Sequence, residues 1–499
     1  MQKVLIANRG EIVIRIANTC KKLGFIPCGI YSDADKNALH IKYCEETQDI
    51  GGSYPNENYL NMDRIIDAAK KMDCDFIHPG YGFLAEKSEF AKQCTDGGFI
   101  FIGPSFKVLE LSGNKVLAKQ VASTIAPVAE GKEVSRLDES IELADKIGYP
   151  VILKATKGGG GRGLRVLNTV NDLKKSFNIS KKEATSSFGS DKVYIEKYIE
   201  NPRHIEVQIL GDKSSSNIIH LGERECSIQR RNQKLIEETP SSALTDETRD
   251  LLIKMAVSIM KEIKYDNAGT VEFLYKDGKF YFMEINSRIQ VEHAITEEVT
   301  GIDIVEQQLD IASGKGLLLE QDKIKAKGHA IECRINAENP FTFTPCPGTV
   351  KQFLAPKNNK NIRIDSSLYS GYAIPPFYDS LLAKIISNGK NRKESIENMR
   401  QALLSFRISG IPSTIPFHVS ALNDDRFLHG VYDTSFINNM KYYSDKDSEI
   451  AAAIFVHLPK RIQYVQNKDE IDLWLLSKYN SFFNPEGTFY YNNIMRWAN

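Results

Sequence analysis

The sequence predicts a multidomain protein of mixed α/β and α+β class. Its 499 residues correspond to about three domains, at roughly 100 to 200 residues for each hydrophobic core. Strand and helix patterns alternate near the N-terminus, whereas short strands dominate the middle of the chain. A composition with 42% hydrophobic and 26% charged residues is typical of globular proteins rather than disordered ones.

Charge and cysteine usage exclude several function classes. Lys plus Arg and Asp plus Glu number 64 each, so no global basic field favours nucleic acid. No apolar run reaches the ~18 residues of a membrane span, and the N-terminal apolar run is too short for a secretory signal. The eight cysteines form no CxxC pair, which favours buried, reduced thiols. We expect a cytoplasmic protein without nucleic-acid or membrane partners.

The N-terminal segment is predicted to form a βαβ unit. Residues 3–7 are apolar, residues 11–23 carry apolar side chains at helical spacing, and residues 25–31 are extended. The turn between the first two elements lacks the three glycines of a dinucleotide fingerprint, which disfavours a nicotinamide site. Continued alternation predicts a doubly wound α/β domain over residues 1–113.

A glycine-rich connection is predicted to contact a ligand. The glycines at 158–161 lie between short strands at 151–155 and 165–167, and further strands are expected at 193–197 and 205–210. Consecutive glycines cost conformational entropy, so a ligand explains them better than structure alone does. The run lacks a P-loop ending and joins two strands, so we expect a flexible hairpin lid over phosphate.

The most informative stretch is a predicted β-hairpin over residues 269–288, with its turn at residues 277–278. Side chains alternate along a strand, so Glu284 and Asn286 are expected on one face together with Phe282, while the intervening residues face away.

Glu272 on the first strand shares that face only if the loop has an odd number of residues. In that case Glu272, Glu284 and Asn286 converge as a hard oxygen cage suited to Mg²⁺. The alternative is a solvated sheet face. The polar residues that follow, from Arg288 to His293, favour a functional site.

A second polar segment supplies cations. Arg230, Arg231 and Lys234 lie close together, and a solvated charge run is the usual explanation of such spacing. Combined with Arg288 and Arg334, however, they provide enough cationic groups to bind a small oxyanion such as bicarbonate, carboxylate or phosphate.

Six motifs together resemble the biotin carboxylase component of biotin-dependent carboxylases, in the ATP-grasp superfamily. They are IANRGEI, HPGYGFL, KGGGGRG, EKYIENPRHIEVQ, ERECSIQRRNQK and MEINSRIQVEH. The resemblance spans about residues 2–445. It implies an N-terminal α/β domain at 1–113, an ATP-grasp domain at 114–330 with a mobile lid at about 130–203, and a C-terminal domain at 331–445. It assigns no role to the tail at 446–499.

The resemblance also implies a role for each matching position. The ATP and other cofactor-binding positions are Lys115, Lys154, Gly158, Gly159, Gly160, Gly161, Glu196, Lys197, Ile199, His204, Gln229 and Leu274. The metal positions are Glu272, Glu284 and Asn286. The bicarbonate positions are Lys234, Arg288, Gln290 and Val291, with Glu292 as general base. On the biotin side, Arg334 would face the ureido oxygen and Tyr81 would form part of the wall.

The implied reaction is carboxylation of biotin from ATP and bicarbonate through carboxyphosphate, with two Mg²⁺ ions that Mn²⁺ can replace. The sequence contains no Ala-Met-Lys-Met carrier motif, so biotin is expected on a separate carrier protein. The other expected partners are a second copy of the chain and a carboxyltransferase subunit.

The resemblance leaves the acceptor open. Asn232 replaces a histidine found in many members, as it does in propionyl-CoA-type subunits. This favours an acyl-CoA carboxylase, as in fatty acid biosynthesis. The alternatives are the biotin carboxylase subunit of a pyruvate carboxylase, another ATP-grasp ligase and a non-catalytic nucleotide-binding subunit.

Overall fold

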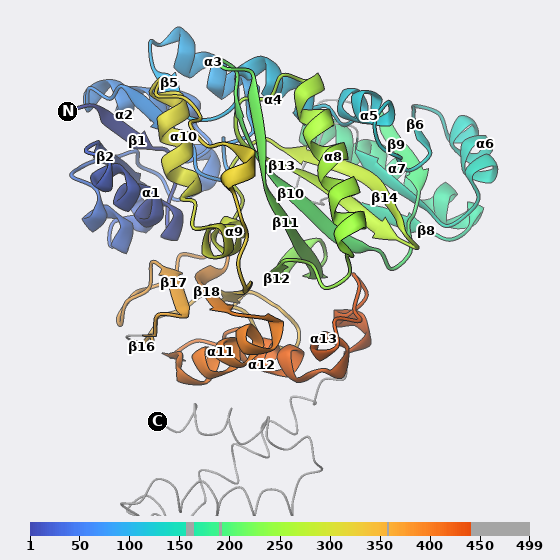
Figure 1. Cartoon of the computed structure of the whole chain (residues 1–499). Coiled ribbons are helices and arrows are strands. Elements are labelled where there is room, and N and C mark those ends of the chain that lie inside the picture. The colour runs from blue at the N-terminus through green and yellow to red at the C-terminus, as the bar shows by residue number, and fades with distance from the viewer. Residues whose placement is uncertain (156–163, 189–191, 357–358, 441–499) are drawn as a thin grey trace, which may run out of the picture.

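The computed structural model describes residues 1–155, 164–188, 192–356 and 359–440, which form three regions around a central sheet (Figure 1). The glycine run at 158–161 and the tail at 446–499, both singled out from the sequence, lie outside the described residues. In the helices of the described ranges, no segment is long and apolar enough to cross a membrane.

The N-terminal region contains a parallel five-stranded sheet of order β3-β2-β1-β4-β5. Its strands are β1 (Lys3–Ile6), β2 (Ile26–Tyr31), β3 (Glu46–Asp49), β4 (Phe76–His78) and β5 (Ile100–Phe101). Its helices are α1 (Glu11–Lys22), α2 (Met62–Lys71) and α3 (Ser88–Asp96). Val4 and Leu5 belong to different core clusters on opposite faces of β1, as alternation requires. The βαβ prediction is confirmed.

The next region is a small antiparallel sheet at the far side of the molecule from the N-terminal sheet (Figure 1). Its order is β6-β9-β7-β8. The elements are α4 (Phe106–Gly113), α5 (Lys115–Ser123), β6 (Gly131–Val134), α6 (Leu137–Ile147), β7 (Val151–Ala155), β8 (Arg165–Leu167), α7 (Val170–Phe188) and β9 (Val193–Lys197). The three short strands expected here are confirmed, and β7 and β8 pair as a hairpin.

The central sheet has eight antiparallel strands in the order β14-β13-β10-β11-β12-β15-β18-β17. These are β10 (Arg203–Asp212), β11 (Asn217–Arg230), β12 (Gln233–Thr239), β13 (Asn267–Lys276), β14 (Lys279–Asn286), β15 (His329–Asn336), β17 (Ile362–Ser366) and β18 (Leu381–Gly389). The associated helices are α8 (Asp246–Glu262), α9 (His293–Thr300) and α10 (Ile304–Ala312). Since β15 pairs with both β12 and β18, C-terminal strands extend the same sheet that carries the middle of the chain.

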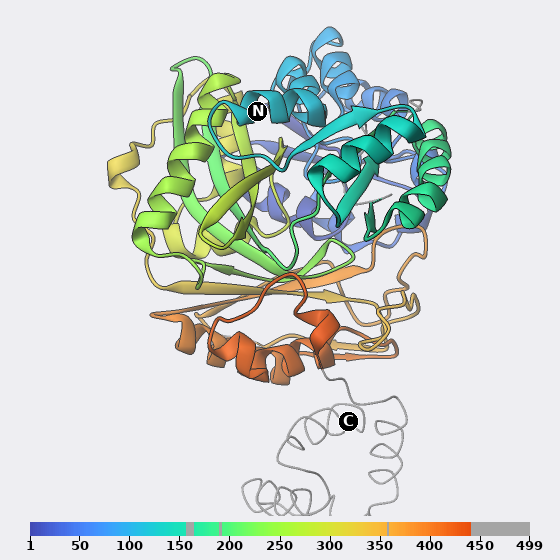
Figure 2. The same cartoon turned by 90° about the vertical axis from the view of Figure 1, so that its right-hand side faces the viewer.

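The C-terminal helices form a layer beneath this sheet (Figure 2). They are α11 (Arg392–Ser405), α12 (Ile415–Asn423) and α13 (Asp425–Leu428), with β16 (Gln352–Leu354) and β19 (Arg407–Ser409) as a separate pair. Short 3₁₀ helices are η1 (Asp33–Asp35), η2 (Leu39–Tyr43), η3 (Pro55–Glu57), η4 (Gln321–Lys323) and η5 (Ile437–Asn439). Ile331 and Cys333 point from β15 into the core that this layer covers.

The β13–β14 hairpin corrects one sequence expectation. Its turn has only two residues, Asp277 and Gly278, both with positive φ (48° and 77°), the geometry that matches strand twist. The odd residue lies instead within β14, where the register shifts between the Glu272–Glu284 pair and the next pair. Glu272 and Glu284 therefore face each other as expected. Phe282, expected beside Glu284, packs with Ile285 in the core, because the bulge reverses the alternation.

Candidate active site

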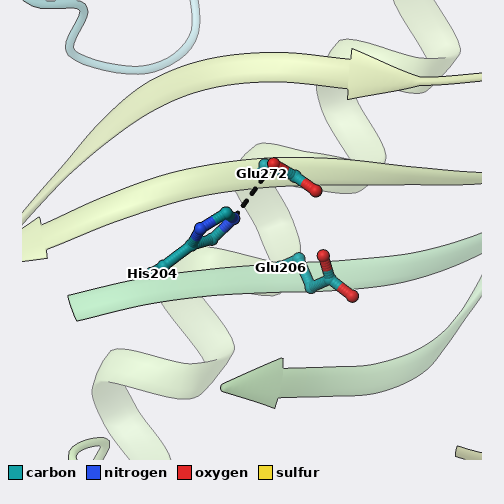
Figure 3. A group of neighbouring side chains, drawn as sticks. All are labelled: His204, Glu206 and Glu272. Carbon is teal, nitrogen blue, oxygen red and sulfur yellow. Dashed lines mark hydrogen bonds and ion pairs between the residues drawn. The ribbon is translucent and has the colours of Figure 1, made fainter. Parts of the chain in front are cut away.

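The site is built on one face of the central sheet, where His204 and Glu206 of β10 lie beside Glu272 of β13 (Figure 3). Glu206 and Glu272 are direct cross-strand partners. The His204 Nε2 and Glu272 Oε2 atoms are 3.0 Å apart and hydrogen-bonded. All three side chains are buried, so their charges interact in a medium less polar than water.

Lys234 of β12 provides the cation that these acids share. Its Nζ lies 2.6 Å from Glu206 Oε2, 2.9 Å from Glu272 Oε1 and 2.7 Å from Glu292 Oε1. Burial disfavours the ammonium, but the surrounding acidic groups outweigh burial and raise the pKa of Lys234 well above its usual range. The carboxylates around it could group about a metal, yet here they converge on the protein's own ammonium.

Glu292 connects Lys234 with Arg334. It immediately precedes α9, and its Oε2 accepts a hydrogen bond of 2.8 Å from Arg334 Nη2 of β15. Burial opposes ionisation, but Lys234, Arg334 and Arg224 outweigh it and hold the pKa of Glu292 well below its usual range. The predicted base is therefore ionised at neutral pH, with one cation on each oxygen.

Arg288 lies in the segment between β14 and α9 and is fixed by its neighbours. It donates to Gln290 Oε1 at 2.7 Å and to Asn286 Oδ1 at 3.1 Å, and its Nε is 3.1 Å from Glu86 Oε2. Gln290 in turn donates to Glu272 Oε1 at 3.1 Å. The structure thus joins three of the four predicted bicarbonate residues, Lys234, Arg288 and Gln290, in one network with two of the predicted metal ligands.

The predicted metal ligands fit a hard divalent cation. Glu284 lies opposite Glu272, and among the described residues no side chain hydrogen-bonds its carboxylate. Burial, reinforced by the charge of Glu272 and opposed by Lys115, raises the pKa of Glu284. A cation between Glu284 and Glu272 would remove this penalty on Glu284, and carboxylate and amide oxygens are the ligands that Mg²⁺ prefers.

The opposite wall of the site carries three lysines around one acid. Glu196 of β9 contacts the ammonium groups of both Lys119 of α5 and Lys154 of β7. Burial opposes ionisation of Glu196, but the two lysines lower its pKa. Lys115 is one helical turn before Lys119, and burial lowers its pKa while Glu284 opposes this. Such clustered ammonium groups suit a polyphosphate.

Several predicted positions lie around this centre. Leu274 is the cross-strand neighbour of His204, and Gln229 is that of Lys234. Lys197 donates to the carbonyl oxygens of Gly148 and Tyr149 at 2.9 and 3.2 Å.

The remaining predicted positions lie towards the edges of the site. Lys197 and Ile199 line a pocket of about 360 Å³ beside the β13–β14 hairpin. Tyr81 donates to Glu11, and the Val291 carbonyl accepts from Lys384 at 2.8 Å. The glycines at 158–161 are not among the described residues.

Sequence reasoning missed the residues that organise the site from beneath. Arg224 is fully buried and donates to Glu206 Oε1 at 2.5 Å and to Gln208 Oε1 at 2.7 Å. Two signals were available: His204, Glu206 and Gln208 alternate along one strand, and Lys119 follows Lys115 at helical spacing. Glu237, which binds Arg334, had no such signal.

The two sheets with facing lysines and acids define an ATP-grasp type of nucleotide-binding enzyme, and the comparisons agree. Residues 114–320 match the ATP-binding domain of the carbamoyl-phosphate synthase L chain. Residues 1–109 and 332–439 match the biotin carboxylase N-terminal and C-terminal domains.

Known relatives then give the family. Biotin carboxylase 1 of Bacillus subtilis is 48% identical over 88% of this chain and 98% of its own. A pyruvate carboxylase subunit from Methanothermobacter thermautotrophicus is 47% identical, over 88% of this chain and 90% of its own length. A solved structure also matches, the biotin carboxylase domain dimer of Hydrogenobacter thermophilus 2-oxoglutarate carboxylase with MgADP and bicarbonate. Its TM-score is 0.86, and it is 43% identical over 89% of this chain and 99% of its own. The chain belongs to the biotin carboxylase family of ATP-dependent ligases.

Proposed function

We propose that this protein carboxylates biotin on a carrier protein, using ATP and bicarbonate through carboxyphosphate. One observation carries the proposal: Lys234 contacts Glu272 on the nucleotide side and Glu292 on the biotin side. A single ammonium thereby connects the predicted metal ligand with the predicted base. This arrangement suits a reaction in which one small anion must meet both ATP and biotin.

The first half of the proposed reaction activates bicarbonate. Arg288 and Lys234 bind the anion, and the Glu292 carboxylate takes the proton from its hydroxyl group. The resulting dianion attacks the γ-phosphorus of ATP and gives carboxyphosphate and ADP. Lys115 and Lys154 bind the phosphates, and Mg²⁺ held by Glu272, Glu284 and Asn286 would supply further neutralisation of charge.

The second half transfers the carboxyl group. Carboxyphosphate releases CO₂ and phosphate, and the phosphate takes the N1′ proton of biotin. N1′ of the resulting enolate then attacks the carbon of CO₂, which gives carboxybiotin. Arg334 stabilises the enolate oxygen of biotin with a guanidinium that Glu237 and Glu292 already hold in place. Such a labile intermediate requires exclusion of water, and we assign this role to a lid at about 130–203.

We further propose an acyl-CoA carboxylase as the complete enzyme, because Asn232 replaces the more frequent histidine. The relatives include proteins named for pyruvate carboxylase and a domain named for 2-oxoglutarate carboxylase, so a keto-acid acceptor is the alternative. Purification from native lysate followed by mass spectrometry would identify the carboxyltransferase. An associated carboxyltransferase specific for keto acids would overturn the acyl-CoA assignment.

The assembly is proposed on similar grounds. We propose a homodimer, since the Hydrogenobacter domain was solved as one, together with a separate biotin carrier and carboxyltransferase. We also propose a cytoplasmic location, because all eight cysteines are free thiols in the structure, as expected in a reducing compartment.

The decisive experiment measures ATP hydrolysis with and without bicarbonate, and incorporation of labelled bicarbonate into biotin. We expect hydrolysis to require bicarbonate and the label to appear in biotin. A biotinylated carrier should react faster than free biotin, because correct docking raises its effective concentration. An ATP hydrolysis rate that is the same with and without bicarbonate would contradict the proposed function.

A further inference from the structure

Two buried carboxyl groups lie behind Arg334, and the reaction proposed above assigns no proton transfer to either of them. Glu237 of β12 and Glu332 of β15 are cross-strand partners, and both are 0% exposed. Glu332 lies two residues before Arg334, so the two side chains share a face of the sheet. The pair therefore lies directly beside the group assigned to biotin.

These two groups differ sharply in their partners. Glu237 Oε1 accepts from Arg334 Nε at 2.6 Å, and Arg334 Nη2 is 2.5 Å from the same oxygen. In contrast, Glu237 Oε2 and both oxygens of Glu332 have no hydrogen-bond partner within the described ranges of the chain. An unpaired buried carboxylate costs several kcal/mol, so the neutral acid is the favoured form of Glu332.

The charge states support this difference. Burial outweighs the attraction of Lys384 and raises the pKa of Glu332 well above its usual range. Burial also raises the pKa of Glu237, against the opposing charge of Arg334, to about 7. Glu292 is held well below its usual range. Glu237 is thus the better proton acceptor of the two carboxylates that flank Arg334.

Arg334 also places these two carboxylates close together. Its Nη2 atom is 2.5 Å from Glu237 Oε1 and 2.8 Å from Glu292 Oε2. Two oxygens in contact with the same nitrogen are near enough for one water molecule to bridge them. A proton on Glu292 therefore has a short route to Glu237.

We propose that Glu237 orients Arg334 and receives the proton that Glu292 removes from bicarbonate, while Glu332 stays protonated beside it. This inference rests on the proposed function. The O–H bond of bicarbonate breaks and its proton passes to Glu292, then through one water to Glu237. The Glu292 carboxylate is thereby restored, and Glu237 releases the proton to solvent after the products leave. Glu237 is a positioning residue, because it acts through Arg334 and Glu292.

The charged and titratable groups that face Glu237 come from five elements. They are Lys234 of its own strand, Cys226 of β11, Glu332 and Arg334 of β15, Glu292 before α9, and, beyond Glu332, Lys384 of β18. Among them, Glu237 is the group whose pKa lies near neutrality, so the acid limb of the pH–rate profile is assigned to it.

The main test is the pH–rate profile of bicarbonate-dependent ATP hydrolysis in Glu237→Gln. The wild type should lose activity below about pH 7, as Glu237 becomes protonated. In Glu237→Gln we expect the plateau rate to fall about tenfold or more and the acid limb to move down by about one pH unit or more. If the plateau rate of Glu237→Gln falls but its acid limb stays at the wild-type pH, Glu237 has only a structural role and the proposal is wrong.

Two variants serve as matched controls. Glu237→Asp keeps a carboxylate, so its acid limb should remain where the wild type has it. Glu332→Gln replaces a neutral acid by a neutral amide. The plateau rate of ATP hydrolysis and the position of the acid limb should therefore both equal those of the wild type. A shifted limb in Glu332→Gln would show that Glu332 is ionised and would contradict the assignment.

Infrared spectroscopy of the wild type gives an independent readout. Buried protonated carboxyl groups should absorb at pH 6, and part of that band should titrate near pH 7. This titrating part should remain in Glu237→Asp, which keeps a carboxyl group, and disappear in Glu237→Gln. Absence of such a band would overturn this inference even in an active enzyme. A wild type without bicarbonate-dependent hydrolysis would instead remove the proposed function, while the infrared result would still decide the proton assignment.

Discussion

At the residue scale, the site depends on charges that are shared rather than paired one to one. Lys234 serves three carboxylates, and Arg334 serves two. A buried ion pair is stable only when its geometry is good and its other polar atoms are satisfied. Shared cations meet this condition. They also allow Lys234 and Arg334 to replace one carboxylate partner by substrate while they keep another.

Replacing Lys234 by Met should abolish turnover. Three buried carboxylates would lose their common cation, and bicarbonate would lose a binding group, so we expect the bicarbonate-dependent ATP hydrolysis rate to fall about 100-fold or more. Lys315→Met is the matched control, because Lys315 is 54% exposed and pairs with the Asp310 carboxylate. Similar rates in both variants would show that Lys234 is not part of the site.

Replacing Arg334 by Ala should separate the two half-reactions. The proposed partner of this guanidinium is the biotin enolate, so biotin carboxylation should fall about tenfold more than ATP hydrolysis. Both rates are measured on the same preparation. Equal losses would place Arg334 on the bicarbonate or ATP side and require a different assignment for the biotin site.

At the element scale, the bulge in β14 and a second ionic cluster position the site from either side of the sheet. Glu238 of β12 points to the face opposite Glu237 and binds Arg392 of α11 at 2.8 Å, with Tyr432 also donating to it. His329 Nε2 lies 3.3 Å from the same carboxylate. This cluster attaches the C-terminal helices to the strand that carries Lys234.

Glu238→Gln should weaken that attachment in a pH-dependent manner. Despite burial, His329 and Arg392 lower the pKa of Glu238 to about 2 from 4.5. The contribution of Glu238 to the free energy of unfolding is therefore complete above pH 4.5 and is lost as the pH falls towards 2. At pH 7 we expect about 3 kcal/mol less unfolding free energy in urea, and a smaller difference at low pH.

The control for this variant is Glu397→Gln, whose side chain is 56% exposed on α11. It should change stability by about 0.5 kcal/mol or less, because exposed ion pairs contribute little. A Glu238→Gln effect as small as this, or one that grows as the pH falls, would show that the cluster does not stabilise the fold.

At the scale of the whole molecule, Glu297 of α9 joins the first and last parts of the described chain. Its Oε1 binds Arg15 of α1 and its Oε2 binds Arg363 of β17, each at 2.7 Å. Glu292 immediately precedes the same short helix. The orientation of the base is therefore linked to contacts between the N-terminal and C-terminal regions.

Glu297→Gln should lower the free energy of unfolding by about 3 kcal/mol, because two largely buried guanidinium groups would lose a shared anion. Urea denaturation followed by fluorescence would measure this. Glu306→Gln is the control, because Glu306 pairs with the 63% exposed Lys22 across the same interface. This variant should change the free energy of unfolding little. Equal stability of the two variants would remove the proposed link.

Much of the fold and of the site was predictable from the sequence. The strands at 151–155, 165–167 and 193–197 agree with β7, β8 and β9, since local alternation and turn residues specify them. The residues expected to bind metal lie on the β13–β14 hairpin, and Arg288 and Gln290 of the following segment are hydrogen-bonded to two of them. Phe282 was placed wrongly because a bulge is a response to strand pairing and leaves no local sequence signal.

The sequence by itself determined the chemistry available: the acids, cations and glycines of the motifs, and the family to which they belong. Only the tertiary structure decided which groups share a charge. Glu237 and Arg334 are 97 residues apart, and Glu332 lies beside them only because β12 and β15 pair. Long-range strand pairing sets such contacts, and burial then shifts the protonation of each group by amounts that depend on its final neighbours.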